Sequence, residues 1–321
     1  MSKKQAPRRV YKYRIFSSLL LDMLVADELF FADPADFNDP LDSRPNVEGD
    51  LSSRQLEDIL NHLIEKRTKA ELTTAAKSLR YRGSKTIAHI THHSRKRALS
   101  LIDEVRYQAS NPNCELEAPL HSLLTQCIEE ELLRRYDKGV VSLASRATCP
   151  LMWSHYGDQH RGICAGYSVP DDTSADLFKI TYGGSRNVKA SDIAIMEQDS
   201  RARIRVDEAV LFRKARSWSY EREWRLIGKR GVQDSPLELE EVIFGIRCDL
   251  SLKYTIVKAL ENRSQPVRFY EMREQRGTFQ LRKRVLDTSE LKALFPRRSR
   301  ISIDALNTLD LEDIGRQNQT E

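Results

Sequence analysis

The spacing of apolar residues changes twice along the chain, and no other feature of the sequence limits the fold as strongly. Within residues 51–136 the apolar residues recur at helical spacing and the alternation of strands is missing. The flanking residues form short runs rich in β-branched and aromatic side chains, which are typical of strands. The sequence therefore predicts an α+β fold, in which residues 1–50 and 137–290 form a strand-rich body and residues 51–136 form a helical insertion.

Local patterns place the individual elements. Strands are expected at residues 10–14, 28–32, 140–145, 163–168, 178–182, 223–227, 237–246, 267–272 and 278–285. Helices are expected at residues 17–25, 149–159, 200–216 and 251–261, besides three or four within the insertion, which an Asn-Pro pair at 111–112 interrupts. The tail, residues 291–321, is first basic and then acidic, and we expect it to be loosely held.

Composition excludes several classes of protein. No run of 18 apolar residues is present, so no membrane span is expected. The 5 cysteines are scattered and never form a Cys-x-x-Cys pair, which argues against a disulfide framework or a thiolate zinc site. This usage predicts a reducing compartment and a cytoplasmic protein. The net charge of +5 is compatible with an anionic partner such as a nucleotide or a nucleic acid.

Three segments carry the residues that suit a functional site, and the first is the loop at residues 33–40. Two prolines, three aspartates and one asparagine give it the turn chemistry of Asx residues. Phe37 would anchor the loop, while Asn38 and Asp39 would cap neighbouring backbone groups. Taken alone, the loop is best interpreted as a structural turn.

The second segment, residues 151–162, combines one tryptophan, one tyrosine and two histidines. On a helix, His155 and Tyr156 would lie on one face, and the helix would end near Gly157, leaving His160 on a loop. The alternative is that Trp153 and Tyr156 belong to the core and that the histidines are capped or exposed. The two histidines are five residues apart and would not share a helix face, so a metal site is not expected.

The third segment, residues 216–225, ends in Tyr-Glu-Arg-Glu-Trp-Arg. If residues 220–226 are extended, Glu221, Glu223 and Arg225 lie on one face. Two adjacent carboxylates raise each other's pKa unless a cation neutralises them, and Arg225 and Lys214 are candidates. The alternative is a solvated ladder of salt bridges. The flanking tryptophans favour partial burial, and a buried carboxylate needs a reason.

A basic stretch at residues 80–97 lies inside the expected insertion. It contains the basic residues Arg80, Arg82, Lys85, Arg95, Lys96 and Arg97 and the histidines His89, His92 and His93. His89 and His93 have the spacing of a metal pair, but no carboxylate lies near them in the sequence. We interpret the stretch as a solvated basic helix face with affinity for phosphate groups, and nucleic acid is the partner that such a face would suit.

Taken together, the motifs resemble a bacterial family catalogued as domain of unknown function 2971. The motifs that carry the resemblance are Tyr-Lys-Tyr-Arg at 11–14, Phe-Asn-Asp-Pro at 37–40, Met-Trp-Ser-His-Tyr at 152–156 with His160 and Gly162, Trp-Ser-Tyr-Glu-Arg-Glu-Trp-Arg at 218–225, and Ile-Phe-Gly at 243–245. Their order and spacing match over about residues 11–270. The resemblance implies a family but no agreed reaction.

Our leading hypothesis is an NAD-using enzyme of the ADP-ribosyltransferase type, with a role as a toxin or phage-defence effector. Cleavage of NAD at the nicotinamide bond creates an oxocarbenium-like cation, which a carboxylate stabilises. The candidate catalytic residues are Glu221, Glu223, His155 and Tyr156. The candidate NAD-binding residues are Tyr13, Arg14, Asn38, Asp39, Trp153, His160 and Arg225. The order of these groups is similar to that of ADP-ribosyltransferases, although a Ser-Thr-Ser strand is missing.

Two alternatives are kept. The first is a non-catalytic module that senses a nucleotide in a polar pocket. The second is a metal-dependent nuclease, in which Asp36, Asp39, Glu221 and Glu223 would hold magnesium, although a compact carboxylate signature is missing. For the leading hypothesis no metal is expected, and the small-molecule partner is a nucleotide. We further expect the Asn38/Asp39 loop, the His155/Tyr156 pair and the Glu221/Glu223 pair to meet in one cleft.

Overall fold

The computed structural model describes residues 7–81, 83, 85–112, 115–135, 138–171 and 173–297. Cys114, Arg82 of the basic stretch and the tail from residue 298 lie outside the described residues. The fold class is α+β, as predicted, with helices and a large mixed sheet. Among the described residues, no helix has the length and apolar character needed to cross a membrane.

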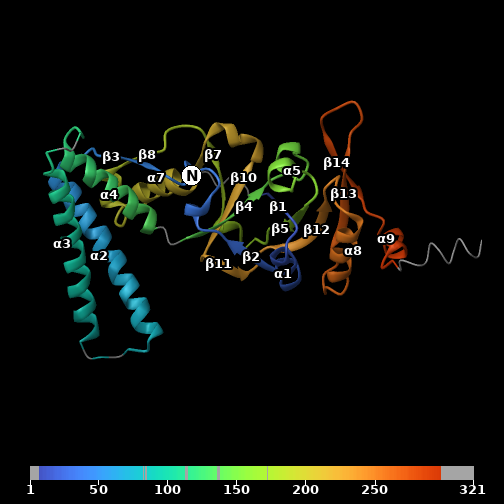
Figure 1. The fold of residues 1–321 in the computed structure, drawn as a ribbon, viewed down its shortest axis with the longest axis horizontal. Helices are drawn as coiled ribbons and strands as arrows, with labels where there is room; N and C mark the ends of the chain where they lie inside the picture. The colour runs from blue at the N-terminus through green and yellow to red at the C-terminus, as the bar shows by residue number, and fades with distance from the viewer. Residues whose placement is uncertain are drawn as a thin grey trace, which may run out of the picture. The chain divides into compact units, whose positions relative to one another are not determined.

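The chain divides into two compact units. Unit 1 comprises Met1–Val10, Glu28–Arg146 and Val169–Glu238, and unit 2 comprises Tyr11–Asp27, Ala147–Ser168 and Leu239–Glu321. Figure 1 shows the elements of both. The helices that the sequence predicts as an insertion are part of unit 1.

The strands of unit 1 include the one that carries the third candidate segment. β10 (Glu223–Gly228) lies between β4 (Gly139–Ala144) and β6 (Leu177–Lys179) and is antiparallel to both. Three further strand pairs belong to this unit. They are β2 (Glu28–Phe31) with β11 (Gly231–Asp234), β3 (Asn46–Glu48) with β8 (Asn187–Lys189), and β7 (Thr181–Tyr182) with β9 (Arg213–Lys214).

The helices of unit 1 share one hydrophobic core. They are α2 (Ser53–Ser78), α3 (Thr86–Ala109), α4 (Pro119–Arg135), α6 (Ala190–Ile195) and α7 (Ser200–Leu211). Ser52 caps α2 through a reciprocal pair with Gln55. Among the described residues of 51–136, the expected helices are confirmed as α2, α3 and α4, and α3 ends before the Asn-Pro pair at 111–112, as expected from the restriction that proline places on its neighbour.

Unit 2 consists of strands with helices packed beside them. Its strands follow the order β14 (Leu281–Val285), β13 (Arg268–Glu274), β12 (Glu238–Phe244), β5 (Ile163–Ser168) and β1 (Arg9–Arg14). Its helices are α1 (Ser18–Ala26), α5 (Pro150–Tyr156), α8 (Leu250–Ala259) and α9 (Thr288–Leu294). β12 and β13 are parallel, and α8 makes the crossover between them.

Two predicted helices end earlier than expected. The helix expected at 149–159 ends at Tyr156, because Asp158, Gln159 and His160 adopt left-handed backbone angles. The helix expected at 200–216 ends at Leu211, since the next residues form β9 and the 3-10 helix η3 (Arg216–Glu221). The other two 3-10 helices are η1 (Pro34–Asp36) and η2 (Thr173–Asp176).

Candidate functional site

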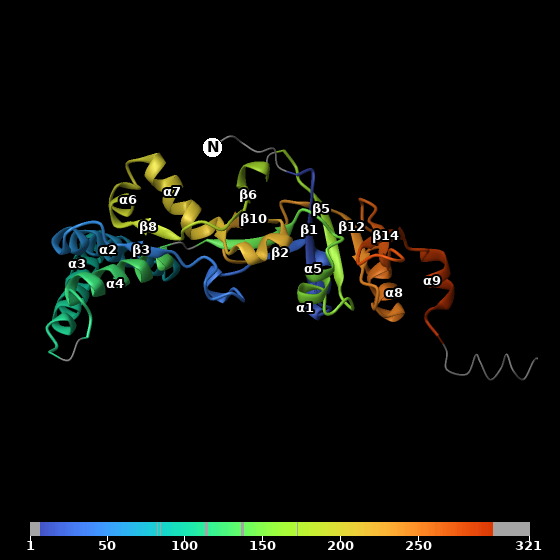
Figure 2. The ribbon, with the colours of Figure 1, turned by 90° about the horizontal axis from the view of Figure 1, so that it is seen from above.

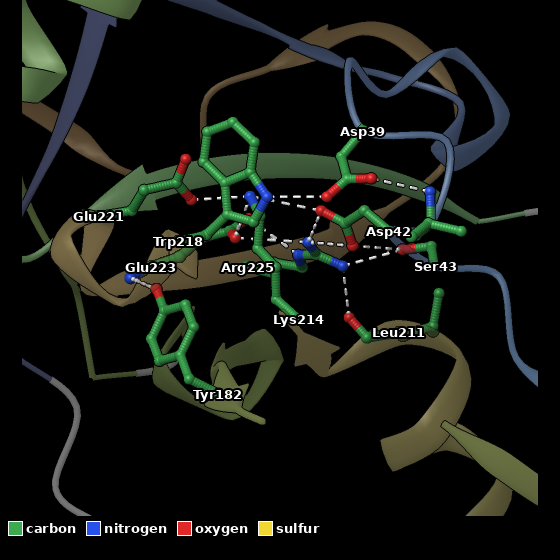
Figure 3. Close-up of polar contacts among 11 residues, drawn as sticks. Asp39, Asp42, Ser43, Tyr182, Leu211, Lys214, Trp218, Glu221, Glu223 and Arg225 are labelled. Atoms are coloured by element: carbon green, nitrogen blue, oxygen red, sulfur yellow. Dashed lines mark hydrogen bonds and ion pairs between the residues drawn. The ribbon is translucent and has the colours of Figure 1, made fainter. Parts of the chain in front are cut away.

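The Glu221–Glu223 segment is not one continuous strand. Glu221 ends η3, Arg222 adopts left-handed angles (φ 48°, ψ 49°), and β10 begins only at Glu223. The strand expected at residues 223–227 is confirmed, but the condition that residues 220–222 extend it is not met. The turn at Arg222 brings the two carboxylates to the same cation instead, as Figure 3 shows.

Arg225 is the centre of a buried polar cluster. Its side chain is 0% exposed. One amino group lies 2.8 and 2.7 Å from the carboxylate oxygens of Asp42, and the Nε atom lies 2.8 Å from Oε1 of Glu223. The other amino group donates to Ser43 Oγ at 2.9 Å and to the Leu211 carbonyl at 2.7 Å. A buried guanidinium needs acceptors and negative charge in place of water, and these residues supply both.

Lys214 is shared by three carboxylates. Its Nζ atom lies 2.7 Å from Glu221, 3.1 Å from Glu223 and 3.3 Å from Asp42. The side chain is 9% exposed, and it lies over the ring of Trp218 at 5.2 Å from the centroid. Burial opposes the charge of this lysine, but the carboxylates outweigh burial and raise its pKa.

The cluster is not a solvated ladder. Glu221, Glu223 and Asp42 are 4%, 2% and 5% exposed, so water does not screen their charges as it would at a surface. Lys214 faces all three carboxylates, and Arg225 faces Asp42 and Glu223.

Burial would make Glu223 harder to ionise, but Arg225 and Lys214 outweigh burial and lower its pKa to about 2, from an ordinary value of 4.5. A pKa that is lowered in the folded state stabilises the fold above the unfolded pKa, and this stabilisation is lost as pH falls through the folded pKa. Glu223 is therefore ionised at every pH at which the protein would work.

This carboxylate gives a pH prediction. The stabilisation from Glu223, on the order of 3 kcal/mol, should be complete above about pH 5 and be lost between about pH 4.5 and 2. Urea unfolding of the natural protein and of Glu223→Gln, measured from pH 6 to 2.5, tests this. The gap between the two free energies of unfolding should narrow as pH falls. A gap of constant size would show that Glu223 does not titrate with folding.

The loop that follows η1 is fastened to this cluster. Asp39 accepts a hydrogen bond of 2.7 Å from Trp218 Nε1 and one of 2.9 Å from the backbone of Leu41. The Phe37 ring lies 5.0 Å from the guanidinium carbon of Arg225. Asn38 is exposed. The anchoring predicted for Phe37 is confirmed, and its partner is the buried arginine.

Three members of the cluster were missed by the sequence analysis. Asp42 and Ser43 lie just beyond the predicted loop, and the hydroxyl of Tyr182 accepts a hydrogen bond of 2.7 Å from the backbone of Glu223. Burial raises the pKa of Tyr182, so the phenol stays neutral. The only signal in the sequence was that Asp42 and Ser43 extend an Asx-rich loop.

The candidates of the second segment lie in unit 2. Trp153 is 0% exposed, its Nε1 donates to the Ala147 carbonyl at 2.8 Å, and Tyr13 meets it edge-on at 5.2 Å between ring centroids. Both aromatic rings therefore belong to the core of this unit, which is the alternative that the sequence left open for Trp153. His155 is exposed and Tyr156 is half-buried.

His160 packs against this core from a turn whose residues have positive φ. Its ring stacks on Trp153 at 6.3 Å, and its Nε2 lies 3.3 Å from Ser154 Oγ, while its buried Nδ1 has no hydrogen-bond partner among the described residues. Burial, followed by the charge of Arg247, lowers the pKa of His160, which keeps the ring neutral. Arg14 is half-buried, and burial lowers its pKa as well.

The structure brings part of the predicted site together. Unit 1 holds Asn38, Asp39, Glu221, Glu223 and Arg225, and unit 2 holds Tyr13, Arg14, Trp153, His155, Tyr156 and His160. A meeting of the two sets in one cleft stays a prediction. Within the described part of the chain, no group of three His, Cys, Asp or Glu side chains is arranged to hold a metal ion.

Comparison with known families agrees with the motif analysis. A family model described as a protein of unknown function (DUF2971) matches residues 152–226, and the chain resembles that family over these residues. The matched residues include Lys214, Glu221, Glu223 and Arg225. They do not include the Phe37–Ser43 loop, which completes the cluster and comes earlier in the chain. Neither the curated proteins nor the solved structures contain a match to the chain.

Proposed function

We propose that the chain is an NAD-using enzyme of the ADP-ribosyltransferase type, in which the carboxylate cluster of unit 1 stabilises the cation formed when NAD is cleaved. In this reaction the bond between ribose C1′ and the nicotinamide nitrogen breaks, and its electron pair leaves with nicotinamide. Water or an acceptor nucleophile then adds to the ribosyl cation and gives up a proton. The enzyme would act in the cytoplasm, where NAD is available, as a toxin or a phage-defence effector.

The observation that carries the proposal is the gathering of three buried carboxylates around Lys214. Arg225 contacts two of them, Asp42 and Glu223. A fixed negative charge in a site from which water is excluded stabilises a developing cation far better than a solvated carboxylate does. The charge is already in position before the substrate binds, so the protein need not reorganise during the reaction.

The two glutamates have different surroundings, which supports different roles. Glu223 lies inside β10, and its oxygens contact both Arg225 and Lys214, so it is the positioning residue. Glu221 lies outside the strand and contacts Lys214. We assign this carboxylate, which is not fixed in the sheet, to the ribosyl cation.

The aromatic and polar groups at the edge of the cluster suit a nucleotide. Trp218 and Asp39 are half-buried, whereas Glu221, Glu223 and Arg225 are buried, so the indole and the Asp39 carboxylate lie nearer to solvent than those three side chains. An indole ring offers a face for stacking nicotinamide or adenine. A carboxylate beside it can accept hydrogen bonds from ribose hydroxyls.

A second candidate function is a non-catalytic module that binds a nucleotide. The observation that favours it is the burial of the carboxylates, each of which is held by a cation of the protein. In that case the cluster would only fasten the Phe37–Ser43 loop to β10, and the ligand would contact the outer groups Trp218 and Asp39.

One set of incubations separates these functions. The purified protein is incubated with NAD alone, and in parallel with magnesium and either DNA or RNA. The proposal predicts release of nicotinamide, detected by chromatography, and no change in the nucleic acid. Binding of NAD by calorimetry without release of nicotinamide would favour the sensing module. Strand cleavage that requires magnesium would favour a nuclease and would overturn the proposal.

A further inference from the structure

The distal part of the α2–α3 hairpin carries a concentrated excess of positive charge. Residues 66–97 contain ten lysines and arginines and a single carboxylate, Glu71. This excess is larger than the net charge of +5 of the whole chain, so the remainder of the sequence is net negative. We name the described residues of 66–97 the basic arm. A polyanion would therefore be attracted to the basic arm in particular.

The basic arm extends beyond the hydrophobic core of unit 1. The buried positions of α2 end at Ile64, and those of α3 begin at Ser94. None of the described residues from Glu65 to His93 is buried. Figure 1 shows α2 and α3 close together at one end and farther apart at the other, and Figure 2 shows them from above. The arm therefore adds little to the core, and its surface is available to a partner.

Most cations of the arm lack an acidic partner. Lys66 pairs with Glu197, Arg67 pairs with Glu131 and Glu71, and Arg95 pairs with Glu65. Six further side chains are exposed and form no ion pair within the described part of the chain; they are Lys69, Lys77, Arg80, Lys85, Lys96 and Arg97. Mutual repulsion among these six opposes the helical pairing, and a polyanion would relieve it.

The geometry points to nucleic acid as the partner of the basic arm. The unpaired cations extend over about 12 Å of α2, from Lys69 to Lys77, and over about 18 Å from Lys85 to Arg97, at 1.5 Å per helical residue. Duplex nucleic acid presents one phosphate charge per about 1.7 Å of its axis, so a line of cations of this length can contact several phosphates at once. The contacts would be with the backbone and independent of base sequence.

An anionic membrane surface fits the arm less well. Helices that bind in the plane of a membrane need a continuous apolar face opposite their cations. Ile87 is the only large apolar residue of α3 between residues 86 and 97 that is exposed. The exposed Leu79 and Tyr81 lie at the end of the arm and do not extend along it. The inference does not depend on the proposed NAD chemistry, because it rests on a different surface.

Two matched triple variants test this. One replaces Lys77, Lys85 and Lys96 of the arm by glutamine, and the control replaces Arg276, Arg282 and Arg284 of the β13–β14 hairpin, which are equally exposed. Both variants change the net charge by the same amount. Binding to a labelled 20-base-pair DNA duplex and to a 20-nucleotide RNA strand is measured by fluorescence anisotropy from 50 to 200 mM salt. Thermal melting confirms that both variants fold.

We expect the logarithm of the binding constant of the natural protein to fall with the logarithm of the salt concentration, with a slope of about −3 to −5. Six cations, each contributing about −0.9 for one phosphate of a duplex, set the limit of this slope. In the arm variant the slope should be smaller in magnitude by about 2 to 3, and the affinity near 0.1 M salt should be about 10²-fold lower. The affinity of the control variant should fall by less than about 3-fold. Equal losses in the two variants, or no binding at 50 mM salt, would overturn the inference. So would loss of binding to phosphatidylserine vesicles in the arm variant while nucleic acid binding is unchanged.

Discussion

Replacement of Arg225 by methionine is expected to lower the free energy of unfolding by about 3–5 kcal/mol, the usual result of removing one partner from a buried ion pair. The side chain is 0% exposed, and its loss would leave Asp42 and Glu223 with Lys214 as the only remaining cation of the cluster. The hydroxyl of Ser43 and the carbonyl of Leu211 would also lose their donor. Each buried acceptor without a donor adds its own penalty.

Urea unfolding followed by circular dichroism measures this effect. Arg216→Met is the matched control, because Arg216 is an exposed arginine of the neighbouring η3 and should lose less than about 1 kcal/mol. Adding Glu223→Gln to Arg225→Met should restore part of the lost stability, since it removes a buried charge that Arg225 no longer balances. A loss for Arg225→Met no larger than that for Arg216→Met would show that the cluster does not stabilise the fold.

Glu221→Gln is expected to lower the rate of nicotinamide release by about 10²–10³, the usual effect of removing one preorganised electrostatic group. Glutamine keeps the shape and can still accept a hydrogen bond from Lys214, but it removes the negative charge that we assign to the ribosyl cation. The expected loss lies in kcat, because the cation exists only in the transition state.

The control is Glu48→Gln, which removes an exposed carboxylate of unit 1 from β3 and should leave the rate unchanged. Glu223→Gln should lower both the rate and the melting temperature, because Glu223 joins Arg225 and Lys214. If Glu221→Gln releases nicotinamide as fast as the natural protein, Glu221 is not the stabilising group. A fall in activity that only parallels a fall in melting temperature would indicate a structural role.

Local patterns predicted much of the fold. β5 occupies the expected residues 163–168, α1 forms within one residue of the expected range 17–25, and α2, α3 and α4 lie in the segment expected to be helical. These features depend on side-chain periodicity and on capping groups that are close in the sequence. The short pair β3–β8 was not predicted, because each strand has only three residues and depends on a partner about 140 positions away.

The cluster was predicted only in part, for the same physical reason. Lys214, Glu221, Glu223 and Arg225 lie within twelve residues, so their pairing could be expected from the sequence. Asp42 contacts Arg225 across 183 positions, and no local pattern marks such a contact. The left-handed turn at Arg222 also has no local signal, because arginine does not favour that conformation.

The turn at Asp158–His160 shows how tertiary contacts override local preference. Three consecutive residues other than glycine adopt positive φ, each at a cost of about 1–3 kcal/mol. Backbone hydrogen bonds hold the turn, from His160 to the Trp153 carbonyl and from Arg247 to the His160 carbonyl. A Cβ atom at Gly245 would lie 2.1 Å from the same His160 carbonyl oxygen, which explains the glycine of the Ile-Phe-Gly motif.

The most direct test of the central claim is the rate of nicotinamide release from NAD by the natural protein, measured from pH 8 to 5. Glu223, with a pKa of about 2, keeps its charge over this range, and so do Lys214 and Arg225, whose pKa values are raised. The groups that position Glu221 therefore keep their charges, and the proposal predicts a release rate that stays constant across the range. Release that disappears below about pH 6, as a catalytic histidine would cause, or no release at any pH, would contradict it.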